Sequence, residues 1–222
     1  MAGSATDSRK RRSKGEKTRE AILDGALRVI ARDGLRSVTH RAVAAEAGVQ
    51  LSLTTYYFKD IESLMEQAFE LFCSRARPNN EQIWVELFDY LDHYSQADLR
   101  KNAVREKICQ DLAAKATDIV LKGIRENPEG LAVEQVFFSR VPQASGLRAM
   151  AAEHRRTLLN PLIELCRRFN REDPEVDAAL ILDTLTRLEY EALVTDTDSI
   201  DRDHIQRLLR RQIGWALGLK RA

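Results

Sequence analysis

The chain has 222 residues, of which 44% are hydrophobic and 31% are charged, and this length suits one or two domains with a sizeable core. The longest uninterrupted apolar runs contain about five residues, whereas a bilayer span needs roughly 18. The sequence therefore excludes a membrane protein. Because no apolar segment follows the basic residues near the N-terminus, we expect no secretion signal and a cytoplasmic location.

The charge is distributed unevenly along the chain. Residues 1–60 contain 12 Lys and Arg against 7 Asp and Glu, whereas residues 61–222 contain 23 against 27. A basic N-terminal part suits a partner that carries phosphates, because electrostatic attraction acts locally at the contacting surface. Taken alone, the basic run at residues 9–14 is equally compatible with a solvated tail.

The residues that enzymes and metal sites need are not grouped in the sequence. Cys73, Cys109 and Cys166 lie far apart, without the closely spaced cysteine or histidine pairs of a zinc site. The four histidines are scattered, and neither a Gly-x-Ser-x-Gly motif nor a glycine-rich phosphate loop is found. We therefore expect a protein that is not an enzyme and that holds no metal and no cofactor.

Helical periodicity runs through almost the whole sequence, and no alternating run of strand length interrupts it, which predicts an all-α fold. The first helix is expected to begin near Ser13, where Glu16 completes a capping box, and to end at Gly34. Residues 1–14 are then a disordered basic arm. Two short helices follow at 40–47, capped by Thr39 and ended by Gly48, and at 51–57.

Longer helices are expected beyond Asp60, which is well placed to cap the next one. That helix is expected to end at Pro78-Asn79-Asn80 because proline disrupts a helix interior. The remaining helices are expected at 81–94, 99–126, 131–141, 147–169 with a kink at Pro161, 173–194 and 201–220.

The two short helices and the tight turn at 47–49 between them predict a helix-turn-helix, in which the second helix enters the major groove of DNA. Side chains with hydroxyls, amides and phenols hydrogen-bond to phosphates and base edges. The second helix and its flanks are rich in them: Gln50, Ser52, Thr54, Thr55, Tyr56 and Tyr57, followed by Lys59. The alternative is a helical hairpin with a polar face, although a helix made only for packing would be more aliphatic.

A longer pattern runs in order through residues 16–65. It comprises Thr18-Arg19-x-x-Ile22-Leu23-x-x-Ala26, Gly34, Val38-Thr39-x-Arg41-x-Val43-Ala44-x-x-Ala47-Gly48-Val49, Tyr56-Tyr57-Phe58 and Leu64. This pattern resembles the N-terminal signature of the TetR family of bacterial transcriptional regulators. The resemblance implies a three-helix helix-turn-helix DNA-binding domain at 15–60, followed by a helical ligand-binding and dimerisation domain at 61–222. The basic arm would then follow the DNA backbone or enter the minor groove.

The resemblance also implies which residues contact DNA. Gln50 stands where the family commonly has a serine N-cap, and Ile61 stands where it often has a lysine, so that lysine's phosphate contact either passes to Lys59 or is absent. Tyr56 is equally suited to packing against the first helix. The implied contacts are Thr39, Arg41, Gln50, Leu51, Ser52, Leu53, Thr55, Tyr56, Tyr57 and Lys59.

Useful specificity requires two reading heads about one DNA turn apart, so we expect a homodimer on a palindromic operator. The apolar faces expected to form its four-helix interface contain Val176, Leu180, Leu188, Leu209, Ile213 and Ala216, with an intramolecular core as the alternative. Candidate residues for binding a small-molecule effector are Trp84, Phe88, Phe137, Phe138, His154 and Arg155, for which core packing is the alternative.

These features together predict a ligand-responsive, DNA-binding transcriptional regulator. We expect a repressor whose partners are a double-stranded DNA operator, a second copy of the chain and a small-molecule effector that releases the DNA. A regulator that answers to a protein partner, without a small-molecule ligand, is the alternative.

Overall fold

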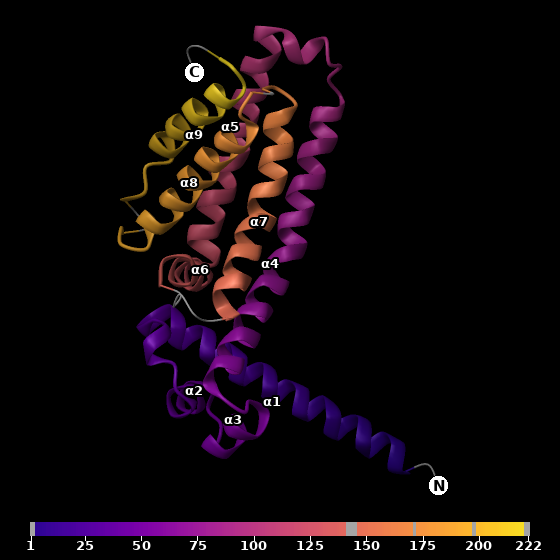
Figure 1. Cartoon of the computed structure of the whole chain (residues 1–222), viewed down its shortest axis with the longest axis vertical. Coiled ribbons are helices and arrows are strands. Elements are labelled where there is room, and N and C mark those ends of the chain that lie inside the picture. The colour runs from indigo at the N-terminus through magenta and orange to yellow at the C-terminus, as the bar shows by residue number, and fades with distance from the viewer. Residues whose placement is uncertain (1–2, 141–145, 171, 197–198, 220–222) are drawn as a thin grey trace. The chain divides into compact units, whose positions relative to one another are not determined.

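The computed structural model describes residues 3–140, 146–170, 172–196 and 199–219. Within these ranges the chain is all-α, as expected, and contains no β-strand (Figure 1). Short 3-10 helices lie at Leu35–Ser37 and Asp98–Arg100. The α-helices are α1 (Gly3–Asp33), α2 (His40–Ala47), α3 (Leu51–Tyr57), α4 (Ile61–Asp92), α5 (Asn102–Glu126), α6 (Pro128–Arg140), α7 (Gly146–Arg167), α8 (Pro174–Ala192) and α9 (Arg202–Ala216).

Two compact units make up the chain. The first comprises Met1–Arg75 together with Ala132–Ala151, and the second comprises Ala76–Leu131 together with Ala152–Ala222. The first unit therefore extends past the boundary expected at residue 60 and includes parts of α6 and α7. Each unit has its own hydrophobic core, containing Phe58, Phe69 and Phe137 in the first and Ile108, Leu209 and Leu217 in the second.

Helix α1 begins at Gly3, earlier than the start expected near Ser13. Ser13 therefore lies inside the helix and does not cap it, and residues 3–14, expected as a disordered arm, are helical. No proline interrupts residues 3–13, and the alanine, arginine and lysine residues there favour a helix. Gly34 ends α1 as expected, with a φ of 80° that glycine tolerates better than other residues.

Helix α4 runs through Pro78 without a break, although two separate helices were expected there. Proline lacks the N–H that would bond to the Ser74 carbonyl. The apolar side chains on the two sides of this defect are anchored, because Phe69 is fully buried in the first core and Leu91 in the second. Burial of these two side chains offsets the lost backbone bond, so the helix continues.

The second unit contains a bundle in which α9 packs across α5 and α8 (Figure 1). The Arg105 guanidinium joins three chain segments of this bundle by donating to backbone carbonyls. Its nitrogens lie 2.6 Å from the Leu99 oxygen, 2.8 Å from that of Leu217 and 3.3 Å from that of Phe169. Within the described ranges, none of the helices has the length and apolar character of a membrane span.

Candidate nucleic-acid interface

Helix α2 has the ends that its sequence predicts. The Thr39 hydroxyl accepts a hydrogen bond from the Ala42 amide at 3.1 Å, which satisfies one of the free donors at the start of the helix. Gly48 ends α2 in the left-handed conformation, with φ of 65°, and its amide bonds to the Ala45 carbonyl at 3.3 Å. The Val49 amide bonds to the Ala44 carbonyl at 3.0 Å. These bonds fix the turn between α2 and α3.

The inner face of α3 holds this helix in the first unit. Thr54 is fully buried, and its hydroxyl donates to the Leu51 carbonyl at 2.8 Å and more weakly to the His40 carbonyl at 3.5 Å. Thr54 was predicted to belong to the polar reading surface, but it packs inward. It lies four residues before the buried Phe58, and this helical spacing is the signal that places both on one face.

The outer face of α3 is polar and open to solvent. Tyr56 is 78% exposed and Leu51 is 43% exposed, whereas Leu53 and Tyr57 are half-buried. Gln50 makes no side-chain cap bond, as its poor capping chemistry predicts. The remaining exposed side chains around this face are Thr39, Arg41, Gln50, Ser52, Thr55 and Lys59.

Tyr56 and Tyr57 pack edge to face, with ring centroids 5.1 Å apart. The Tyr57 hydroxyl points at α1, because a Cβ added at Gly15 would lie 3.2 Å from it. Tyr57 therefore joins α3 to α1. Tyr56 is free to reach a phosphate because it is largely exposed.

The cations of the first unit fall into two groups. Arg28, Arg32 and Arg75 form ion pairs with carboxylates of the same unit. Arg41 and Lys59 form no ion pair within the part of the chain that the structure describes. Their charges are consequently available to phosphates, whose neutralisation dominates the affinity of proteins for DNA.

The residues expected to bind an effector are divided between the two units. Phe137 is buried in the core of the first unit, 4.0 Å from Phe69 between ring centroids, and Phe138 packs against the same core. The other four lie in the second unit, where His154 is buried and Arg155 forms an ion pair with Asp183. Phe137 and Phe138 thus pack with the core of the first unit, in line with the alternative of core packing.

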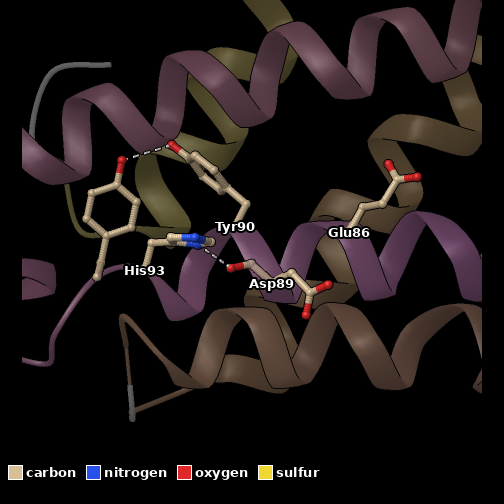
Figure 2. Close-up of a pocket in the computed structure, with 5 residues that line it drawn as sticks. Glu86, Asp89, Tyr90 and His93 are labelled. Atoms are coloured by element: carbon tan, nitrogen blue, oxygen red, sulfur yellow. Dashed lines mark hydrogen bonds between the residues drawn. The ribbon is translucent and has the colours of Figure 1, made fainter.

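A surface hollow of about 500 Å³ lies along the last turns of α4 (Figure 2). The His93 ring nitrogen Nδ1 donates to the Asp89 carbonyl at 2.7 Å, and the Tyr90 hydroxyl donates to Asp111 at 2.5 Å. Burial and the bond to Asp111 raise the pKa of the Tyr90 phenol, which keeps it neutral. None of the expected effector residues lines this hollow, which is formed by Glu86, Asp89, Tyr90, His93 and Tyr94.

The residues expected at a dimer interface are partly in the interior. Leu188, Leu209, Ile213 and Ala216 are buried in the core of the second unit, so their stripes on α8 and α9 face the chain's own helices. These four positions therefore follow the alternative of an intramolecular core, which the sequence could not separate from an interface because both kinds of stripe have the same spacing. Val176 and Leu180 are 55% and 48% exposed and remain on the surface.

This arrangement defines a class of protein. A small helical unit contains two short helices joined by a fixed turn. The second helix exposes a polar face to solvent, and the exposed cations Arg41 and Lys59 lie beside it. Those are the features of a helix-turn-helix protein that binds DNA and regulates transcription.

Comparison with known proteins supports the class of protein that the fold defines. Residues 22–68 match the sequence model of the family described as "Bacterial regulatory proteins, tetR family". No curated protein sequence matches the chain significantly. The sequence pattern that resembles the TetR family of bacterial transcriptional regulators is thus supported over residues 22–68.

Solved structures share the fold over most of the chain. A transcriptional regulator from Rhodococcus sp. is 18% identical with a TM-score of 0.63, covering 90% of this chain and 96% of its own. A putative TetR-family regulator from Mesorhizobium loti is 16% identical with a TM-score of 0.63, covering 92% and 96%. NalD of Pseudomonas aeruginosa, the secondary repressor of the MexAB-OprM multidrug efflux pump, is 19% identical with a TM-score of 0.55, covering 90% and 96%.

Proposed function

We propose that the protein is a homodimeric repressor that acts in the cytoplasm, binds a palindromic operator and is released by a small-molecule effector. The observation that carries the proposal is the exposed polar face of α3 beside Arg41 and Lys59, which have no ion pair within the described ranges. Residues 15–60 would bind DNA and residues 61–222 would dimerise and respond to the effector. NalD, which has the same fold, is described as a repressor.

The proposed contacts divide by chemistry. The hydroxyl, amide and apolar side chains on the outer face of α3 suit base edges, while cations and phenols suit phosphates. Thr39 and Arg41 at the start of α2 suit the DNA backbone, where the N-terminus of a helix favours an anion. The half-buried Leu53 and Tyr57 would contact DNA only through their exposed edges.

For the dimer, we propose the outward faces of α8 and α9. Val176 and Leu180 on α8 and Trp215 on α9 are large apolar side chains that are about half exposed. The Arg211 guanidinium lies over the Trp215 ring, 5.8 Å from its centroid. Tryptophan and arginine are enriched in interface cores, and a twofold axis would bring each α8 beside an α9 or α8 of the other copy.

For the effector, we propose the neighbourhood of Trp84 and Phe88 in the second unit, whose ring centroids are 5.9 Å apart. The Arg168 guanidinium lies 4.9 Å from the Phe88 centroid. A second candidate function, regulation by a protein partner, is favoured by the hollow at Asp89 and His93, because it opens on the surface of the molecule.

The test measures the number of chains in the free protein and in its DNA complex, and the release of DNA by a small molecule. Light scattering after gel filtration should give a dimer in free solution, and titration of a duplex selected from a random pool should saturate at two chains or a multiple of two. A library of small molecules is then screened for loss of the complex. Strictly monomeric protein would refute the dimer. Release by none of the compounds, but by a protein captured from the native host, would favour the second candidate.

A further inference from the structure

We infer that Glu46 is a positioning residue for DNA recognition: with Arg28, Arg32 and Gly25 of α1 it fixes the angle of the α2–α3 pair without touching DNA. We call these four residues the α1–α2 clamp. The inference rests on the DNA-binding function proposed above.

The clamp begins where α1 and α2 come closest. A Cβ added at Gly25 would lie 2.9 Å from the Ala47 side chain, 3.1 Å from the Ala47 amide nitrogen and 3.2 Å from the Val43 carbonyl oxygen. Two of these three atoms belong to the backbone, which cannot rotate away. Glycine is therefore needed at position 25 for α2 to cross α1 at this separation, although it weakens the interior of a helix.

Arginines on the same face of α1 continue the contact. Arg28 and Arg32 follow Gly25 at spacings of three and seven residues, which lie on one stripe of a helix. Arg28 donates from Nε to Glu46 Oε1 at 2.8 Å and from Nη2 to the Glu46 carbonyl at 3.2 Å. Arg32 donates from Nη1 to the other carboxylate oxygen at 2.9 Å. Each oxygen of the carboxylate thus has its own arginine.

The three contacts lie along one face of α1, so they restrain the rotation of α2 as well as its separation from α1. The close approach at Gly25 sets how near the helices lie, and the two arginines hold the last turn of α2 from one side. Arg28 also bonds to a carbonyl at the C-terminus of α2, where the helix dipole favours a positive charge. The side-chain hydrogen bonds from Arg28 and Arg32 keep the pKa of Glu46 below its usual range, so the carboxylate is charged at neutral pH.

The restraint passes to α3 through short connections. The turn after Glu46 is closed by the Val49 amide on the Ala44 carbonyl, and Thr54 of α3 reaches back to the His40 carbonyl of α2. The α2–α3 pair therefore follows any rotation of α2 on α1. A small rotation would move side chains at the far end of α3 away from their base edges, because base readout depends on hydrogen-bond geometry.

Glu46 does not fit the alternative of a direct DNA contact. A carboxylate is repelled by phosphates, and both oxygens of this one already accept bonds from arginines. Its removal has two separable effects. Loss of a negative charge alone tightens binding to every duplex alike, whereas loss of orientation weakens binding only to a duplex whose bases are read.

The experiment compares two duplexes of equal length, one selected by the wild-type protein from a random pool and one with that sequence scrambled. Fluorescence anisotropy gives both dissociation constants, and their ratio measures discrimination. For Glu46→Ala we expect the ratio to fall roughly tenfold, as for loss of well-placed base contacts. Glu70→Ala is the matched control, because Glu70 is an exposed glutamate of the same unit that forms no ion pair with the residues that the structure describes. Its ratio should stay at the wild-type value.

A second set of variants separates positioning from folding. Arg28→Glu should lower the ratio, and the charge-swapped Arg28→Glu, Glu46→Arg pair should recover part of the loss. If circular dichroism shows that Glu46→Ala is unfolded at the assay temperature, Arg28→Glu and the charge-swapped pair test the inference in its place. A ratio that does not fall in folded Glu46→Ala, or a swap without recovery, would overturn the inference. If the wild-type protein discriminates between no duplexes, the proposed function itself is refuted.

Discussion

Arg41 offers a quantitative test of the interface, because its substitution should change the salt dependence of DNA binding by a predictable amount. The side chain is exposed at the start of α2 and pairs with no carboxylate of the described chain. The slope of log K against log salt is negative, and each lost phosphate contact reduces its magnitude by about 0.9. Arg41→Ala should therefore reduce the magnitude by about 1.8 in a dimer with two reading heads. The affinity should fall about equally for the selected duplex and for a scrambled one, as for loss of a phosphate contact.

The control is Arg75→Ala, which removes the same charge from a different environment. The Arg75 guanidinium lies 2.5 Å from Asp24 and 2.8 Å from Glu20, both on α1. Anisotropy titrations between about 50 and 200 mM salt give the slopes for both variants. An unchanged slope in Arg41→Ala, or an equal change in Arg75→Ala, would refute the division of cations into paired and phosphate-binding groups.

Four further predictions concern assembly and stability. Leu180→Asp should convert the dimer to monomers in gel filtration, because it places a charge in the proposed interface; a persistent dimer would exclude that face. Gly48→Ala should lower the free energy of unfolding by about 1 kcal/mol in urea titrations, since φ is 65° there. Arg105→Met should lower it by about 2 to 4 kcal/mol, because three carbonyls lose their donor; a smaller loss would mean that water replaces the guanidinium. The Lys101 ammonium and the Ser95 hydroxyl lower the pKa of Asp98 to about 2. The bonds of this carboxylate therefore stabilise the fold fully above about pH 4 and are lost as the pH falls through about 2. An NMR titration midpoint for Asp98 of about 3.8, the ordinary value, would contradict this.

The local ends of the two short helices could be predicted from the sequence. Thr39 and Gly48 act through bonds to residues three or four positions away, so their effect does not depend on the rest of the fold. The start of α1 and the continuity of α4 through Pro78 could not be predicted in this way. For the start of α1, the capping box at Ser13 and Glu16 competes with an uninterrupted helix-favouring segment before it, and local pattern does not decide between the two. The continuity of α4 depends on burial in two cores that only the folded chain contains.

The site was predictable in part for the same reason. The polar composition of α3 identified the segment, but only its packing separates the inward Thr54 from the outward Thr55. The apolar stripe of α9 was found correctly, yet its spacing does not say whether the stripe faces α5 and α8 or a second chain. Gly25 gave a weak signal as a glycine inside a helix, and Glu46 gave none, because its partners lie 18 and 14 residues away in sequence.

The central claim is that the outer face of α3 reads bases in two symmetric copies, and sequencing of duplexes selected from a random pool tests it most directly. The wild-type protein should enrich an inverted repeat with half-sites about 10 base pairs apart or a multiple of that spacing. Gln50→Ala should relax the preference at the same position of both half-sites. No enrichment, a motif without a repeat, or an identical motif from wild type and variant would contradict the account.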